Sequence, residues 1–490
     1  MLNPTENQSL VKACTSSHSL SGLFVAAILY LVCISGTVAV FHSEIGRWEQ
    51  PLAPEGNIAS IEQVEASLNR YLDENTELSD HEYVFFPSDA SPRYKIGNKK
   101  DSWYLDSEGE FAQSAAAPYA EFLTRLHTSL LLPESFALYV VSITGVFLAA
   151  LIISGILSHP SIIRDAFKWR KNNSERIYQV DIHNRLSVWG LPFYLMIAMT
   201  GVYFGFVGLL FAAYAEFAHN GDRAGLLEEI YGAEPQLTQQ LGHVEFANAY
   251  RQVEAMNPGG KPLFAILHEA GTDKQFLDFF VQQPERLLYS ETFRFSIQGE
   301  FISTGDYIDG AVGKQIAYST YRLHFGDFAG LSVKIIYALL GLSLTVICVS
   351  GVNIWLLKRK HETFVNPLWT SLVWGTPAVM LLCGSLSLLL KNPTAFWFWL
   401  PLAFLLVASV WVKNTQALKT QLLVLNAILT LVLLIVYVVS FGSSILASAA
   451  IGGELFLMAL MIWFGVMAYR SFKLQRSCIN PAELTPVFVQ

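Results

Sequence analysis

Eight apolar runs dominate this chain of 490 residues and limit what it can fold into. A helix needs about 20 consecutive apolar residues to cross the hydrocarbon core of a bilayer. Only 15% of the residues are charged, whereas soluble domains carry about 25%. The sequence therefore predicts an all-α membrane bundle of about eight transmembrane helices, of which the sixth is the shortest. The runs lie at 20–42, 134–157, 186–215, 331–357, 369–390, 395–412, 421–441 and 450–469.

Lysine and arginine gather in alternate short loops, and this bias sets the orientation of a membrane protein. The first run has no A-x-A-like cleavage site, so we interpret it as an uncleaved anchor helix. Because basic loops stay in the cytoplasm, both termini are predicted to be cytoplasmic. The residues behind this prediction are Arg164, Lys168, Arg170, Lys171, Arg176, the 358–360 run, Lys413, Lys419, Arg470, Lys473 and Arg476.

Two polar segments, 43–125 and 216–322, are predicted to lie outside the membrane. Each begins with an amphipathic helix, at 58–72 and near 243–256, and continues with short aromatic runs typical of antiparallel strands. Neither contains cysteine, so packing rather than disulfides must hold them together. We expect two small α+β domains. The net charge of −8 argues against nucleic acid as a partner.

A repeated pattern predicts that the first four membrane helices are two copies of a helix–domain–helix core. Each helix contains a Ser-Gly or Thr-Gly doublet preceded by a histidine. The histidine-to-glycine spacing alternates between short and long: 18 for His18 to Gly36, 28 for His127 to Gly155, 18 for His183 to Gly201 and 27 for His324 to Gly351. Such parallel repeats are related by an axis along the membrane normal.

This reading divides the chain into six parts. The predicted boundaries are 1–42 for the cytoplasmic N-terminus and first membrane helix, 43–125 for the first external domain, 126–215 for the second and third helices with their basic loop, 216–322 for the second external domain, 323–360 for the fourth helix, and 361–490 for a C-terminal four-helix membrane region with a cytoplasmic tail.

Four histidines are the strongest candidates for chemistry, because ionisable groups at a membrane are costly and mark function. His18 and His183 are expected at the cytoplasmic end, and His127 and His324 at the external end. Each pair is equivalent in the repeat, and two imidazoles that face each other in a helix bundle suit bis-histidine ligation of haem iron. The doublet glycines would let a flat macrocycle approach. No zinc motif is present, whereas a proton-coupled small-molecule transporter remains an alternative.

The chain also resembles the PepSY-associated transmembrane family, which includes ferrisiderophore reductases of the bacterial inner membrane. The matching stretches cover residues 18–360 in order: "HSLSGL", "SGTVAVFHSEI", "LHTSL", "SGILSHPSIIRDAFKWR", "DIHNRLSVWGLPF", "TGVYF", "RLHFGDFAGL" and "SGVNIWLLKRK". The resemblance implies PepSY-type periplasmic domains above a membrane core that binds haem b. Two haem b groups are expected. It also implies His18, His183, His127 and His324 as ligands to the haem iron, with His159 and His42 as alternatives.

The function implied by the resemblance is an inner-membrane oxidoreductase that passes electrons to a periplasmic ferric siderophore or other iron(III) chelate. The sequence has no recognisable nucleotide-binding motif, so the electron donor must be a cytoplasmic flavoprotein, reduced flavin or quinol. No residue is identified as catalytic. A non-catalytic sensor or scaffold that binds a partner protein is the other alternative, and the C-terminal four-helix region has no assigned role.

Overall fold

A computed structural model describes residues 4–56, 58–75, 77–168, 174–233, 235–284, 286–391 and 394–479. Arg170, Lys171 and the end of the predicted cytoplasmic tail lie outside these ranges. The chain forms two compact units. Unit 1 comprises 1–51, 118–202 and 336–490, and unit 2 comprises 52–117 and 203–335.

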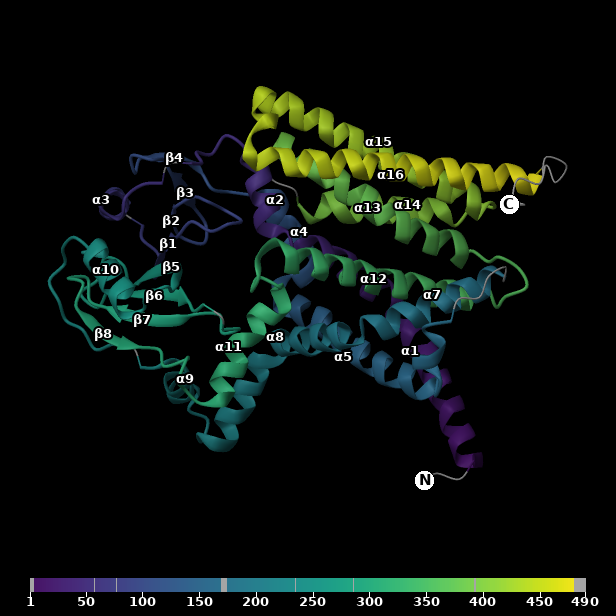
Figure 1. Cartoon of the computed structure of the whole chain (residues 1–490), viewed down its shortest axis with the longest axis horizontal. Helices are drawn as coiled ribbons and strands as arrows, with labels where there is room; N and C mark the ends of the chain where they lie inside the picture. The colour runs from purple at the N-terminus through teal and green to yellow at the C-terminus, as the bar shows by residue number, and fades with distance from the viewer. Residues whose placement is uncertain are drawn as a thin grey trace. The chain divides into compact units, whose positions relative to one another are not determined.

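Unit 1 is helical, and its long helices run alongside one another (Figure 1). Helices α8 and α12 contribute residues to both units. The helices are α1 (Pro4–Ala39), α2 (His42–Glu49), α4 (Pro118–Ser129), α5 (Glu134–Ser158), α6 (Ile162–Asp165), α7 (Glu175–Trp189), α8 (Leu191–Ala218), α12 (Gly330–Leu356), α13 (Val365–Leu390), α14 (Ala395–Ser409), α15 (Thr415–Phe441) and α16 (Ser448–Ile479), with a short 3-10 helix at Gly442–Leu446.

Among the described residues, seven helices are long and apolar enough to cross a membrane. They coincide with seven of the eight predicted runs: Gln8–Ala39, Phe136–Ser158, Leu191–Ala218, Gly330–Leu356, Val365–Leu390, Thr415–Leu446 and Ser448–Arg476. The chain is therefore a multi-pass membrane protein. The predicted sixth span is not confirmed, because α14 has only 15 residues, about 22 Å of helix against a core of about 30 Å.

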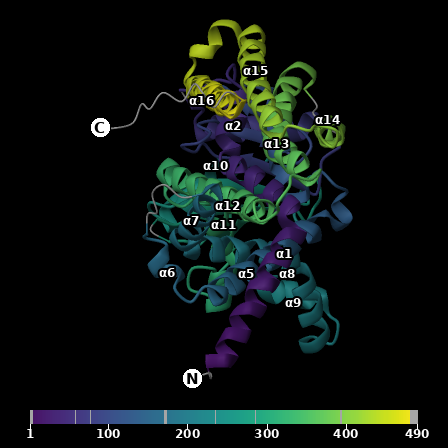
Figure 2. The same cartoon turned by 90° about the vertical axis from the view of Figure 1, so that its right-hand side faces the viewer.

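Helix α14 nevertheless returns the chain toward the end of the bundle at which α13 begins. Thr415, the first residue of α15, donates a hydrogen bond to the Glu362 carboxylate at 2.7 Å, and Glu362 lies three residues before the start of α13. At the same end, Gln416 donates to Ser471 near the end of α16. The helices α13, α15 and α16 lie side by side in both views (Figures 1 and 2).

The helices α13 to α16 share an apolar core with α1, α2 and α4 of the same unit. The Tyr30 hydroxyl of α1 donates to the Val373 carbonyl of α13 at 2.6 Å. Trp48 of α2 stacks on Tyr437 at 4.6 Å and donates its indole N–H to Glu454 at 2.9 Å. These contacts join α13, α15 and α16 to α1 and α2.

Unit 2 contains one eight-stranded antiparallel sheet in the order β4-β3-β2-β1-β5-β6-β7-β8. The two segments predicted as separate domains share this sheet, because β1 of the first pairs with β5 of the second. The pairing removes two exposed strand edges. The strands are β1 (His81–Phe85), β2 (Lys95–Gly97), β3 (Ser102–Leu105), β4 (Phe111–Ser114), β5 (Lys261–His268), β6 (Phe276–Gln282), β7 (Glu291–Phe295) and β8 (Phe301–Thr304).

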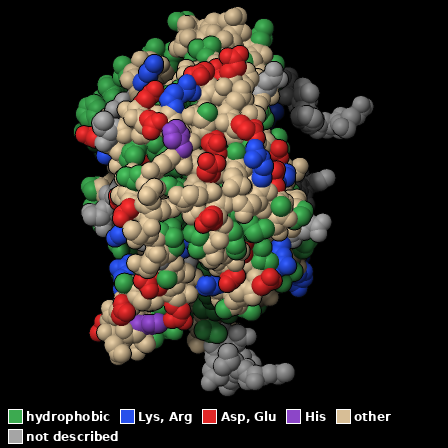
Figure 3. Space-filling view, turned by 90° about the vertical axis from the view of Figure 1, so that its left-hand side faces the viewer, with side chains coloured by type: hydrophobic (Ala, Val, Ile, Leu, Met, Phe, Trp, Pro, Cys, Tyr) green, Lys and Arg blue, Asp and Glu red, His purple; other side chains and the backbone are tan. Residues whose placement is uncertain are grey.

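Four further helices belong to unit 2: α3 (Ile61–Glu74), α9 (Arg223–Tyr231), α10 (Phe246–Met256) and α11 (Val312–Phe325). Ser60 and Gln63 form a capping box that starts α3, and Val64 and Leu68 on this helix are buried in the core of the unit. Seen from the side of α3 and α10, the surface of unit 2 carries interspersed acidic and basic side chains (Figure 3).

Candidate functional site

The four repeated histidines occupy similar positions in the chain but not identical local structures. His18 lies within the long helix α1, whereas His127, His183 and His324 lie on α4, α7 and α11. Each of these three helices precedes a membrane helix and is separated from it by a short break. The sequence placed these histidines at the mouths of the spans and did not reveal the separate helices.

His18 and His183 make the same hydrogen bonds to neighbouring membrane helices. Nδ1 of His18 lies 3.0 Å from the Leu151 carbonyl oxygen and 3.2 Å from the Ser154 hydroxyl on α5. A nitrogen that faces a carbonyl oxygen must carry the proton, so Nε2 of the neutral ring keeps its lone pair. Metal-binding histidines have this arrangement, with one ring nitrogen donating to a backbone carbonyl.

Nδ1 of His183 lies 3.1 Å from the Ile347 carbonyl oxygen and 3.2 Å from the Ser350 hydroxyl on α12. Burial lowers the pKa of His183 to about 4, with a smaller contribution from His18. The imidazole is therefore neutral at physiological pH, which is the form that binds a metal.

The two rings lie at the distance that one shared metal ion requires. Their centroids are 6.3 Å apart and their planes are at 86°. Two imidazoles that hold one metal ion, each through a nitrogen at about 2 Å, can have ring centroids about 6 Å apart. The pair of donors, their spacing and their tautomers thus fit residues that would hold a haem iron.

The doublet glycines make room for imidazoles. A Cβ added at Gly155 would lie 3.1 Å from Cε1 of His18, and one added at Gly351 would lie 3.3 Å from Cε1 of His183. At Gly36 the added carbon would lie 2.6 Å from Cε1 of His127. At these three glycines, a histidine ring from a neighbouring helix lies where a side chain would be. The approach of a flat macrocycle to the doublet glycines stays a prediction.

His127 and His324 belong to different units, so their pairing stays a prediction. His127 is buried on α4, and its Nδ1 lies 3.0 Å from the Val32 carbonyl oxygen on α1, which matches the contacts of His18 and His183. In unit 2, the ring of His324 lies 5.4 Å from that of Phe204. Phe204 follows Gly201 by one helical turn.

The two alternative ligands have other partners. Nε2 of His159 lies 3.7 Å from the Asp165 carboxylate, and its Nδ1 lies 3.4 Å from the Ser161 hydroxyl. His42 faces α4, where its Nδ1 lies 2.9 Å from the Thr124 hydroxyl. These contacts favour the four repeated histidines over His159.

A buried carboxylate that the sequence analysis did not identify supports α4, the helix of His127. Glu49 accepts hydrogen bonds from the backbone N–H groups of Tyr119 and Ala120, both at 2.8 Å. These groups lie in the first turn of α4, where free N–H groups need acceptors. Burial raises the pKa of Glu49 to about 7. The sequence signal is an acidic residue at the end of the short helix α2, which follows the first membrane helix.

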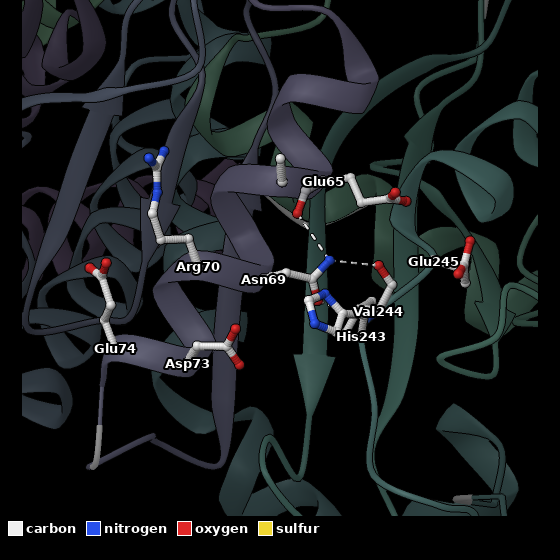
Figure 4. Close-up of a pocket in the computed structure, with 9 residues that line it drawn as sticks. Glu65, Asn69, Arg70, Asp73, Glu74, His243, Val244 and Glu245 are labelled. Carbon is white, nitrogen blue, oxygen red and sulfur yellow. Dashed lines mark hydrogen bonds between the residues drawn. The ribbon is translucent and has the colours of Figure 1, made fainter.

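A concave region in unit 2 has a volume of about 630 Å³ and lies between α3 and the segment 243–245 (Figure 4). Asn69 joins the two walls by bonding the backbone of Val244 in both directions. The Glu65 carboxylate accepts a hydrogen bond from the Ala247 N–H in the first turn of α10. Within the described ranges, no group of three or more His, Cys, Asp or Glu residues could hold a metal ion. This pocket therefore remains unassigned.

Comparison with known proteins gives two findings. The model of the PepSY-associated TM region matches residues 15–358. A protein of Pseudomonas aeruginosa described as uncharacterized is 30% identical over 118 residues, which are 24% of this chain and 30% of the relative. The match thus spans less than a third of that relative's length.

Proposed function

Because the chain belongs to the PepSY-associated transmembrane family, we propose that it is a haem b-containing membrane oxidoreductase. In this proposal it passes electrons from the cytoplasmic side of the bacterial inner membrane to a periplasmic acceptor, a ferric siderophore or another iron(III) chelate. Haem b, when bound, supplies one-electron chemistry.

The observation that carries the proposal is the pair His18 and His183. Their ring centroids are 6.3 Å apart, and each Nδ1 faces a backbone carbonyl oxygen of a neighbouring helix. The two rings come from different helices, and their spacing suits two imidazoles that would hold one iron. The backbone bonds keep both rings in the tautomer that leaves Nε2 for iron.

The proposal includes the duplicated core, because equivalent residues make equivalent contacts. Leu151 and Ser154 hydrogen-bond to Nδ1 of His18, and Ile347 and Ser350 hydrogen-bond to Nδ1 of His183 in the same way. The other pair, His127 and His324, would hold a second haem. Two groups divide the path across a core of about 30 Å into shorter steps, and electron tunnelling slows steeply with distance.

The orientation in this proposal has both termini in the cytoplasm. The basic loops support it, and so does the bond between Thr415 and Glu362, since the chain has returned to one end after α13 and α14. The proposed donor is a cytoplasmic flavoprotein, reduced flavin or quinol. The acceptor is a chelate because reduction to Fe(II) weakens its bonds to hard oxygen ligands.

The test is a reduced-minus-oxidised absorbance spectrum of the purified protein, with a pyridine haemochrome assay for haem per chain. We expect two b-type haems. His18→Ala and His183→Ala should each remove the same haem, and His127→Ala and His324→Ala the other. His361→Ala is the matched control, because His361 is exposed and should leave both.

Absence of haem in protein from haem-supplemented cells would overturn the proposal and leave a sensor or scaffold as the better reading. Loss of both haems, or of neither, in the single variants would contradict the pairing of histidines.

A further inference from the structure

One face of the sheet in unit 2 carries a half-exposed group of aromatic rings. We call Tyr83, Phe85, Lys95, Phe264 and Phe280 the aromatic patch, and all five are half-buried. The Phe264 ring lies 4.6 Å from that of Phe280 and 5.8 Å from that of Phe85. Phe85 in turn stacks on Tyr83 at 5.6 Å. The rings thus form one continuous surface.

Strand alternation explains why these rings are not part of the core. Val84 and Ala265, the neighbours of patch residues along β1 and β5, are 2% and 1% exposed and pack beneath α3 and α10. Successive side chains of a strand point to opposite faces, so the patch lies on the face that these helices do not cover. Aromatic side chains at strand spacing here build a surface.

The charges on this face suit an anion. The Lys95 ammonium lies 4.0 Å from the centroid of the Phe85 ring, which is cation–π geometry. The acid further along the same face, Asp278, is neutralised by a two-point bond to Arg294 at 2.8 and 2.9 Å. Lys95 therefore contributes a positive charge that Asp278 does not cancel.

Ring contacts connect the aromatic patch to a proposed haem ligand. The Phe264 ring lies 6.4 Å from Tyr289, and Tyr289 lies 4.5 Å from Tyr321. Tyr321 stacks on Phe325 at 4.3 Å, and Phe325 lies 5.6 Å from His324. All of these residues belong to unit 2, so one compact unit contains the whole series.

A buried arginine fixes the middle of this series. Arg322 of α11 is 3% exposed and donates to the Arg286 carbonyl at 2.8 Å and the Leu288 carbonyl at 3.4 Å. The Tyr289 N–H donates to the Tyr318 carbonyl of the same helix. The loop that carries Tyr289 is thereby attached to the helix that carries His324.

We propose that the aromatic patch is the docking site for the iron(III) chelate, and that the chelate it accepts has anionic, aromatic oxygen-donor ligands. The rings stack on the aromatic ligands, and Lys95 attracts their charge. The series Phe264–Tyr289–Tyr321–Phe325 gives a packed path from His324 to the docked chelate. This inference rests on the proposed function.

The step transfers one electron and breaks no bond of the protein. The reductant is the electron donor of the proposed function, and the docked Fe(III) becomes Fe(II). The aromatic side chains serve as a tunnelling medium and are not themselves oxidised. Fe(II) binds the chelating oxygens less strongly, so the iron is released from its ligands afterwards.

Binding is tested without electron transfer by gallium(III) tris(2,3-dihydroxybenzoate), since Ga(III) resembles Fe(III) in charge and size but is not reduced. Equilibrium dialysis against the full-length protein in nanodiscs measures the dissociation constant. Phe85→Leu should raise it about tenfold, because loss of one stacking ring typically costs about 1–3 kcal/mol. Lys95→Gln should raise it severalfold, whereas Lys99→Gln, an exposed control on the same hairpin, should not.

Gallium(III) citrate, which lacks rings, should bind more weakly than the aromatic complex. Equal binding of the two complexes, or unchanged binding in both Phe85→Leu and Lys95→Gln, would overturn the docking site.

The path is tested separately by stopped-flow reoxidation of dithionite-reduced protein with the iron(III) form of the same complex. Tyr321→Leu should slow reoxidation while the gallium dissociation constant stays unchanged. Tyr318→Leu is the control, because Tyr318 lies on the same helix but stacks on Tyr307 at 3.7 Å. Equal rates in Tyr321→Leu and Tyr318→Leu would overturn the path.

Failures of the two proposals are distinguishable. Protein with two haems whose reoxidation by the iron complex is unaffected by Phe85→Leu and Lys95→Gln would keep the proposed function and refute the docking site. Protein without haem that still binds the gallium complex at the patch would refute the oxidoreductase and keep the docking site.

Discussion

Replacing Gly36 by alanine provides the sharpest test of how the histidines are held. The added Cβ would lie 2.6 Å from Cε1 and 2.8 Å from Nδ1 of His127. Carbon atoms in contact normally lie about 3.5–4.0 Å apart, so the ring must withdraw by about 1 Å. A ligand bond to a metal is only about 2 Å long. The Gly36→Ala variant should therefore lose the proposed haem that His127 would hold and keep the other.

The same substitution should have a smaller effect at the other two doublets. At Gly155 and Gly351 the closest approaches are 3.1 and 3.3 Å, which a shift of a few tenths of an ångström relieves. The control is Gly208→Ala in α8, where the added carbon meets nothing within 4 Å. Alanine is favoured over glycine in a helix interior by about 0.5–1 kcal/mol, so this control should keep both haems and melt slightly higher.

The assay is haem per chain by pyridine haemochrome, combined with the reduced-minus-oxidised spectrum and the melting temperature of the same sample. We expect the highest haem content in Gly208→Ala, a lower content in Gly351→Ala and Gly155→Ala, and the lowest in Gly36→Ala. Full occupancy of both haems in Gly36→Ala, with an unchanged spectrum, would show that haem binding does not need the space that this glycine leaves for the His127 ring.

Three further changes have expected outcomes. Ser154→Ala and Ser350→Ala each remove one hydrogen-bond acceptor at 3.2 Å from a histidine Nδ1. Each variant should weaken haem affinity about tenfold, as measured by haem transfer to apomyoglobin. An unchanged affinity would mean that the backbone carbonyl alone fixes the histidine ring. Because burial raises the pKa of Glu49 to about 7, the contribution of this group to the free energy of unfolding should be largest below its ordinary pKa of about 4.5. This contribution should fall by up to about 3 kcal/mol as the pH rises through 7. Chemical denaturation from pH 4.5 to 8 should show this slope, and Glu49→Gln should flatten it. Trp48→Phe leaves the Glu454 carboxyl without its indole donor and should lower the free energy of unfolding by about 1–3 kcal/mol. The loss should be much smaller when Glu454 is already replaced by leucine. Equal losses with and without Glu454→Leu would show that the Trp48–Glu454 hydrogen bond contributes little.

Much of the secondary structure followed from local pattern. Seven apolar runs are long helices, since the length of such a run is set by the bilayer and can be counted. The amphipathic run at 58–72 became α3 and the aromatic runs became strands, because alternation records which faces are buried. The run at 395–412 was less informative. Its helix ends at Ser409, and the pattern did not show how far it extends.

The sequence predicted that His18 pairs with His183, but it did not predict the contacts that hold their rings. Spacing alone paired His18 with His183, and the structure places their rings 6.3 Å apart. Spacing could not show that the His18 ring packs against Gly155 or that the His183 ring packs against Gly351, because these contacts join different helices. The same is true of Glu49, whose partners lie 70 residues further along the chain.

The amino-acid sequence was enough to predict that the chain crosses a membrane, which segments fold outside the apolar runs, and which four histidines recur at similar spacings. These properties depend on hydrophobicity and spacing along the chain, which are local quantities. The three-dimensional structure was needed to find that β1 pairs with β5 in a single sheet and that the C-terminal helices pack on α1 and α2. It was also needed to find that rings from β1, β5, β6 and α11 form one connected series. Such contacts depend on how distant segments pack, and packing follows from the shape of the whole unit and cannot be read from any one stretch of residues.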